Sequence, residues 1–241
     1  MSESPLAVGL ERGGALLRLR LARPKANLID AAMIAALREA FAAHRGRPGL
    51  LAALLEAEGP HFSFGASVEE HLPDRCAAML GSLHALIVEM LEWPATIVVA
   101  ARGQCLGGGL EVAMAGSLIF AGSDAKFGQP EIRLGVFAPA ASVLLPARVG
   151  QAAAEEMLLT GRALPAAEVK AAGLVFRVDD DPEAAALGFA LAAVRGDYVA
   201  TAKRRIAEVE ALYLERMMRS HDANEGLNAF VAKRHAVWQH R

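Results

Sequence analysis

The stretch that decides the fold is 103-GQCLGGGLEVAMAG-116, in which three consecutive glycines precede an alanine-rich apolar segment. We predict a loop that runs into a helix at about Gly108. The first N–H groups of a helix have no partner within it, and the helix dipole adds positive potential there. Because glycine lets another group approach the backbone closely, the stretch favours a pocket for an anion, or for an oxygen that becomes one. The alternative is that the glycines only permit close helix packing.

Two glutamates stand where they can reach such a pocket. Glu111 lies one helical turn beyond the glycines, and Glu131 lies in 128-GQPE-131, where Pro130 restricts the backbone. Two carboxylates at one site can divide acid and base roles, since desolvation and like charge raise the pKa of one of them. The alternative is that both are surface glutamates in a chain with many acidic residues.

A second glycine loop, 62-FSFGASV-68, places Gly65 directly after Phe64. An exposed backbone N–H in this turn would form, with one from the glycine helix, the two arms of an oxyanion hole. The alternative is an ordinary turn between a strand and a helix.

The rest of the chain supplies a frame of interleaved strands and helices, followed by a helical tail. Alternating leucines predict a hairpin of residues 6–10 and 17–21, and Asp30 is a candidate N-cap for a helix ending near His44. We further predict strands at 50–55, 96–100, 118–121 and 174–178, a helix at 75–92, a loop at 126–135, and helix through most of the remainder after Pro139.

Composition narrows the class of protein. The chain has 241 residues, of which 54% are hydrophobic and 22% charged, so it can build a sizeable core. A net charge of −2 argues against nucleic-acid binding, and neither a GxGxxG fingerprint nor a metal-ligand cluster stands out. Two isolated cysteines, with no secretory signal or membrane-length apolar run, predict a cytoplasmic protein.

The order of the three motifs, F-x-x-G-A, then LGGGLE, then FGQPEIRLG, resembles the crotonase (enoyl-CoA hydratase/isomerase) superfamily from about residue 6 to the C-terminus. The resemblance implies an α/β fold, a spiral of ββα units over residues 1–190 with a helical C-terminal trimerisation region over 191–241. It also implies a homo-trimer or a dimer of trimers. Residues 181–203 are shorter than in the relatives, which bears on where the tail lies against a neighbouring subunit.

The same resemblance assigns roles at the site. A thioester carbonyl would be held by the backbone N–H groups of Phe64 and Gly108. Glu111 and Glu131 would be the catalytic pair, one activating water and the other handling the proton. The implied partner is an acyl-CoA; coenzyme A belongs to the substrate, and no separate cofactor or metal is expected.

Contacts to CoA and to the acyl group follow by motif position. The CoA residues would be Lys25, Ala26, Leu28, Ala66, Ser67 and Val68, with Phe230 and Lys233 of the tail reaching the CoA of a neighbouring subunit. The acyl pocket would be lined by His71, Leu72, Phe137 and Pro139.

The segment 135-GVFAPAAS-142 stands where ordinary relatives carry a glycine-rich run, and its stiffer, more apolar wall suits a flat ring. We therefore expect conjugate (1,4) addition of water to a cyclic dienoyl-CoA, a reaction of anaerobic aromatic degradation. The alternatives are a hydratase or isomerase acting on another acyl-CoA, and a non-catalytic CoA-binding protein.

Overall fold

A computed structural model of the chain describes residues 4–72, 74–194, 211, 215 and 219–239. The chain divides into two compact units, Met1–Val194 and Arg195–Arg241. The described part of the second unit contains helix α9 (His221–Val231). The assignment of the tail as an oligomerisation region stays a prediction.

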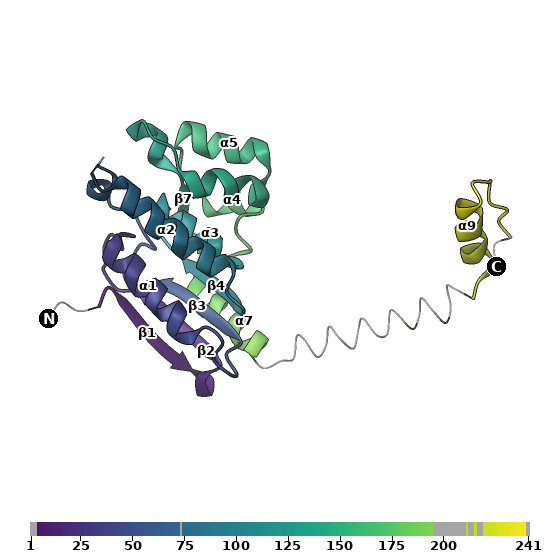
Figure 1. The fold of residues 1–241 in the computed structure, drawn as a ribbon, viewed down its shortest axis with the longest axis horizontal. Coiled ribbons are helices and arrows are strands. Elements are labelled where there is room, and N and C mark those ends of the chain that lie inside the picture. The colour runs from purple at the N-terminus through teal and green to yellow at the C-terminus, as the bar shows by residue number, and fades with distance from the viewer. Residues whose placement is uncertain (1–3, 73, 195–210, 212–214, 216–218, 240–241) are drawn as a thin grey trace. The chain divides into compact units, whose positions relative to one another are not determined.

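The first unit is built on a six-stranded sheet with the order β1-β2-β3-β4-β6-β9 (Figure 1). Its strands are β1 (Leu6–Glu11), β2 (Leu16–Leu21), β3 (Ala52–Ala57), β4 (Thr96–Ala101), β6 (Leu118–Gly122) and β9 (Arg177–Asp179). β1 and β2 form an antiparallel hairpin, and all later neighbours pair in parallel. A second sheet joins β5 (Gln104–Leu106), β7 (Lys126–Gly128) and β8 (Leu164–Pro165) in that order.

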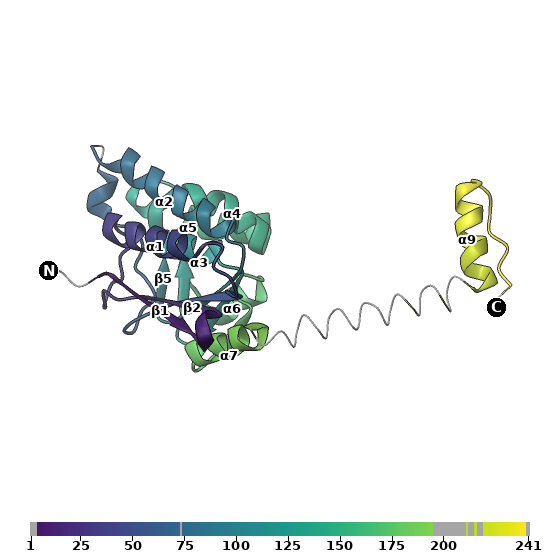
Figure 2. The ribbon, with the colours of Figure 1, turned by 60° about the horizontal axis from the view of Figure 1, so that its bottom comes forward.

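The two faces of the large sheet are covered differently. On one face, Leu17, Leu19 and Leu21 belong to the main core, which also takes in α1 (Ala31–His44), α2 (Cys76–Leu91) and α3 (Gly108–Ala115). On the other face, Leu16 and Leu54 pack against α7 (Pro182–Val194). Figure 2 shows the strands between α1 and α7. Successive side chains of β2 point to opposite faces of the sheet, so this strand contributes to both hydrophobic cores.

The remaining elements follow the small sheet or link the strands. They are the short 3-10 helices η1 (Arg12–Gly14), η2 (Val68–His71) and η3 (Pro130–Leu134), and the helices α4 (Pro139–Val149), α5 (Gln151–Thr160) and α6 (Ala166–Ala171). No described helix is both long enough and apolar enough to cross a bilayer.

Most predicted elements are confirmed to within two residues at each end. The hairpin forms, and Asp30 caps α1 by accepting a hydrogen bond from the N–H of Met33 at 2.8 Å. The predicted loop at 126–135 is wrong, because Phe127 pairs with Cys105 in β5 and Pro130 starts η3. The predicted strand at 174–178 starts later, at Arg177, because Leu174 still closes the turn after α6 through a bond to the carbonyl of Val169.

Candidate active site

The two glycine loops follow the central strands β3 and β4 along the chain, and they meet each other. A Cβ on Gly65 would lie 3.1 Å from the carbonyl oxygen of Leu106 and 3.6 Å from the nitrogen of Gly108. A Cβ on Gly108 would lie 3.0 Å from that of Ala66. The two loops are therefore in direct backbone contact, and the absence of side chains at the glycines is what allows it.

Glu111 projects from the first turn of α3 and is buried, with 3% of its surface exposed. Its Oε1 accepts a hydrogen bond from the N–H of Ala141 at 2.8 Å, and the N–H of Ala140 also favours its charged form. Both donors lie in the first turn of α4, where Pro139 begins the helix. The carboxylate is thus held by the N-terminal end of a second helix, where the dipole favours a negative charge.

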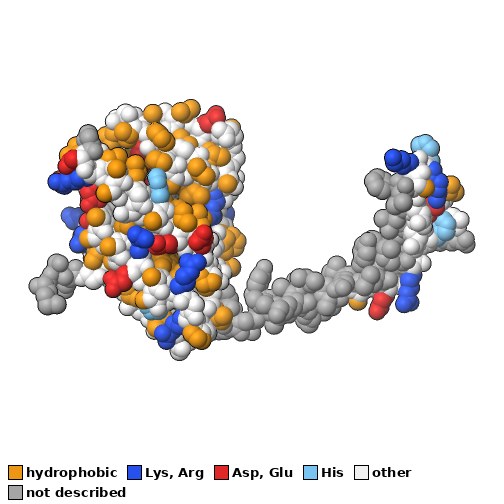
Figure 3. All heavy atoms as spheres, viewed as in Figure 1, with side chains coloured by type: hydrophobic (Ala, Val, Ile, Leu, Met, Phe, Trp, Pro, Cys, Tyr) orange, Lys and Arg blue, Asp and Glu red, His pale blue; other side chains and the backbone are white. Residues whose placement is uncertain are grey.

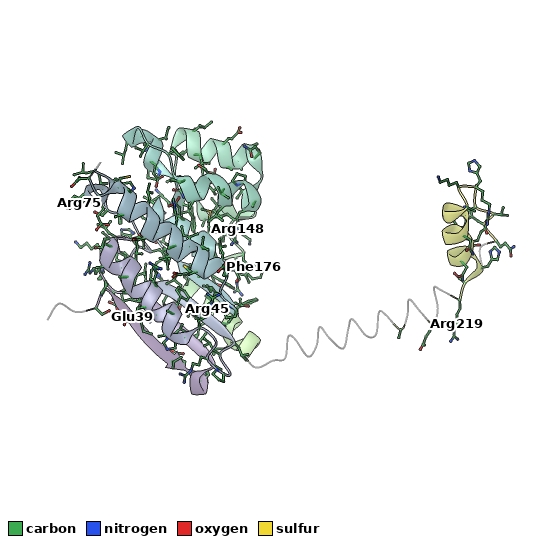
Figure 4. The ribbon with its side chains drawn as sticks, in the orientation of Figure 1. Glu39, Arg45, Arg75, Arg148, Phe176 and Arg219 are labelled. Carbon is green, nitrogen blue, oxygen red and sulfur yellow. The ribbon has the colours of Figure 1, made fainter. Side chains whose placement is uncertain are left out.

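The opposite end of α3 is tied to α4 as well. Arg148 (labelled in Figure 4) reaches from α4 to carbonyls at the C-terminal end of α3, donating to Met114 at 2.6 Å and also to Gly116. A guanidinium at a helix C-terminus satisfies carbonyls that lack helical partners. Together with the bond to Ala141, it fixes the position of Glu111 at both ends of the helix that carries it.

Glu131 lies on η3 and faces the glycine loop. A Cβ on Gly107 would lie 2.6 Å from its Oε1, so the carboxylate rests directly on the bare backbone there. The buried amide of Gln129 is assigned with its nitrogen toward Glu131, since that nitrogen then lies 3.0 Å from Oε2 and 3.2 Å from Oε1. Glu131 is therefore held by a side chain from its own segment.

The two carboxylates have the electrostatic character of an acid–base pair. Burial, together with the nearby charge of Glu111, raises the pKa of Glu131 to about 7. Burial also raises the pKa of Glu111, against the lowering effects of the Ala141 and Ala140 amides and of His84 and His71. Because each group resists ionisation beside the other, one can hold a proton near neutral pH while the other accepts one.

The predicted oxyanion hole is half open. Gly108 begins α3, and its N–H has no partner one turn earlier within the helix. The N–H of Phe64, however, donates to the carbonyl of Ala26 at 2.9 Å, because residues 62–66 run beside the loop at 26–29. The assignment of Phe64 stays a prediction, and it requires the Ala26 carbonyl to move aside when a thioester enters.

The residues predicted to contact CoA from the first unit lie on two adjacent segments, 25–28 and 66–68, which are joined by backbone contacts of their neighbours. Lys25 and Val68 are exposed, Leu28 lies on the edge of exposure, and Ala26, Ala66 and Ser67 are half-buried. In the second unit, Lys233 is exposed just after α9; Phe230 lies on α9, and its side chain is outside the described part of the structure.

Two of the predicted pocket residues, Leu72 and Phe137, are 53% and 69% exposed, and Phe64 of the predicted oxyanion hole is 44% exposed. We call these three side chains the apolar rim. Pro139 is half-buried at the start of α4, and the ring of His71 bonds through Nδ1 to the carbonyl of Ser67 at 2.7 Å. In Figure 3, hydrophobic side chains gather over the part of the first unit that α2, α4 and α5 form.

The sequence analysis did not predict three groups that hold the two glutamates: Gln129, Arg148 and the first amides of α4. Gln129 had a signal, since it stands two residues before Glu131 in the same motif. Arg148 and the α4 amides had none, because they meet α3 only through the packing of two helices. Cys105 is buried, and burial raises the pKa of its thiol, which agrees with a packing role. Among the described residues, no group of three or more His, Cys, Asp or Glu side chains could hold a metal.

Comparison with known proteins agrees with this geometry. A family model for enoyl-CoA hydratase/isomerase matches residues 11–241. The chain belongs to the enoyl-CoA hydratase/isomerase family. Within this family, it is 61% identical, over the full length of both proteins, to cyclohexa-1,5-dienecarbonyl-CoA hydratase from Thauera aromatica. It is 33% identical, again over both full lengths, to carnitinyl-CoA dehydratase from Salmonella enteritidis.

The alignment with the Thauera enzyme covers 258 positions, more than the 241 residues of the chain, so the chain lacks residues that this relative has. Solved structures show the crotonase fold. An enoyl-CoA hydratase/carnithine racemase from Magnetospirillum magneticum superimposes with a TM-score of 0.72 at 28% identity, covering 100% of this chain and 97% of that one. An enoyl-CoA hydratase from Bacillus anthracis superimposes with a TM-score of 0.75 at 23% identity, covering 98% and 100%.

The raised pKa of Glu131 predicts a stability cost that Glu131→Gln should remove. Below the ordinary pKa of 4.5, the carboxyl is protonated in both the folded and the unfolded chain. Between pH 4.5 and about 7, only the unfolded chain releases the proton. A rise in pH over this range therefore favours unfolding. The quantity of interest is the free energy of unfolding of E131Q minus that of the wild type. We expect this difference to be about 2 kcal/mol larger at pH 8 than at pH 4.5, allowing for partial exposure of the carboxyl. Urea unfolding at both pH values measures this. A difference independent of pH would contradict it.

Proposed function

We propose that the protein adds water to cyclohexa-1,5-diene-1-carbonyl-CoA and yields 6-hydroxycyclohex-1-ene-1-carbonyl-CoA. The observation that carries this proposal is the pair of buried Glu111 and half-buried Glu131, held beside a glycine helix whose first N–H groups are free of helical partners. The relative at 61% identity bears the name of this activity, and the apolar rim suits a flat ring more than a polar acyl chain.

The reaction follows from the positions of these groups. One carboxylate takes a proton from water while the oxygen of the water forms a bond to the β-carbon of the diene. The electron pair of that double bond moves toward the thioester, whose oxygen becomes negative and is stabilised by the N–H of Gly108. The second carboxyl then gives its proton to the far alkene carbon, and the new double bond stays conjugated to the thioester. One molecule of water is added, and the pair of glutamates returns to its starting charge after one proton exchange.

The substrate preference can be measured directly. We expect kcat/KM for cyclohexa-1,5-diene-1-carbonyl-CoA to exceed that for crotonyl-CoA by at least about 10²-fold, because a pocket shaped for a ring positions a linear chain poorly. Products identified by mass and NMR would confirm the 1,4-addition. A preference for crotonyl-CoA would favour a linear enoyl-CoA hydratase, and binding of both esters without turnover would favour a CoA-binding protein.

The assembly and the location are part of the same proposal. We expect a homo-trimer or a dimer of trimers, an expectation that rests on membership of the enoyl-CoA hydratase/isomerase family. Two free cysteines, Cys76 and Cys105, suit the cytoplasm.

A further inference from the structure

His84 is a half-buried histidine that the mechanism above does not use. It lies on α2, between the core residues Leu83 and Ile87, and α2 packs against α3, the helix that carries Glu111. Within the described part of the chain, its Nε2 is buried and has no hydrogen-bond partner. Leaving a buried polar atom unpaired is unfavourable, so this nitrogen calls for a partner that the structure without substrate does not supply.

The carboxylate of Glu111 is the acceptor that such a nitrogen would find. His84 is close enough that a positive charge on its ring would lower the pKa of Glu111, and its effect ranks above those of the Ala140 amide and of His71. A carboxylate has about four acceptor directions, so the bonds from α4 leave room for another donor. The cluster of Glu111, Glu131, His71 and His84 thus holds two acids and two imidazoles around one site.

The other ionisable groups packed around α2 already have partners or face solvent. Arg38 of α1 binds Glu89 of α2, and His44 bonds to the carbonyl of Ala40. On η2, Glu70 accepts from the N–H of Ala31, while Glu69 is exposed; on α1, Glu39 is exposed (Figure 4). Of the two acids in the cluster, Glu111 is the one whose pKa a charge on His84 would lower, so Glu111 is the acceptor that we assign to His84.

We propose that His84 is a positioning residue for Glu111, to which it donates a hydrogen bond from Nε2–H when substrate fills the site. The bond holds the carboxylate in place and favours its ionised form, so that Glu111 can act at a lower pH than burial alone would allow. This inference rests on the proposed hydration. Because His84 is not proposed to touch the substrate, replacing His84 should change kcat and leave KM nearly unchanged.

Three variants test the proposal. His84→Gln places an amide N–H where Nε2 stands, His84→Asn places one where Nδ1 stands, and His84→Leu has no donor. For hydration of the diene ester, we expect H84L and H84N to lose about 10-fold or more in kcat with KM within threefold of the wild type. Their loss of activity at acid pH should begin at a higher pH, whereas H84Q should retain most of the activity and the wild-type pH profile.

Equal activity and equal pH profiles in H84L and the wild type would overturn the proposal, as would equal losses in H84Q and H84N. Thermal unfolding of each variant identifies any that fail to fold, and the comparison of H84Q with H84N still decides the question if H84L is unstable. Wild-type protein that hydrates no ester at all would refute the proposed function instead, so the two failures are distinguishable.

Discussion

Replacing either of the two glutamates proposed to be catalytic, Glu111 or Glu131, with glutamine should abolish hydration while thioester binding survives. In Glu131→Gln and Glu111→Gln, the side chain keeps its size but can neither take a proton from water nor return one. General acid–base catalysis contributes about 10²–10⁴ in rate, and we expect each variant to fall by about 10³ in kcat. The affinity for the product ester should stay within about threefold of the wild type, because the predicted CoA contacts lie on other loops. Steady-state kinetics and isothermal titration measure the two quantities.

A matched control is Glu69→Gln, which makes the same chemical change at an exposed position on η2 near the rim. It should retain wild-type kcat. The double variant E111Q/E131Q should be little worse than either single variant, because the two groups act as a unit. If E131Q retained more than a tenth of the wild-type kcat, Glu131 would not be a catalytic acid or base, and a binding role for the protein would become the better explanation.

Structural features that depend on a local or repeated pattern could be predicted from the sequence, whereas contacts that depend on packing could not. The leucine alternation of the hairpin and the cap at Asp30 are local, so they appear in the structure as expected. The three site motifs could be placed together because their order resembles the crotonase superfamily. In the structure, two of them follow β3 and β4, which pair in parallel, and the third begins in β7.

The parts that could not be predicted are contacts between segments. Strand β5 exists because three residues pair with β7 about twenty positions later, and nothing in 104–106 distinguishes them from a loop. His84 stands on a helix whose pattern gives no sign that one of its polar positions faces α3. The engaged N–H of Phe64 is a third case, since its partner Ala26 lies in a loop whose path no local pattern fixes.

A methyl group at position 107 should impair catalysis through Glu131. Gly107 has φ 51° and ψ −131°, a conformation that costs a residue with a side chain on the order of 1–3 kcal/mol. The Cβ of Gly107→Ala would also lie 2.6 Å from Oε1 of Glu131, so the carboxylate must move. Since a displacement of about 1 Å can cost 10²-fold in rate, we expect G107A to lose about 10² in kcat, measured per mole of folded protein.

The backbone cost and the displacement can be separated with Gly13→Ala. Gly13 also has a positive φ, 66°, but lies in the hairpin turn with nothing within 4 Å of an added Cβ. G13A should lose stability by about 1–2 kcal/mol and keep its kcat. If G107A acts by moving Glu131, then adding it to E131Q should cause little further loss in kcat, whereas an independent effect would multiply the two losses. A G107A protein with wild-type kcat would mean that Glu131 does not need the bare backbone of Gly107 beneath it, and the contact between the glycine loop and the carboxylate would then have no part in catalysis.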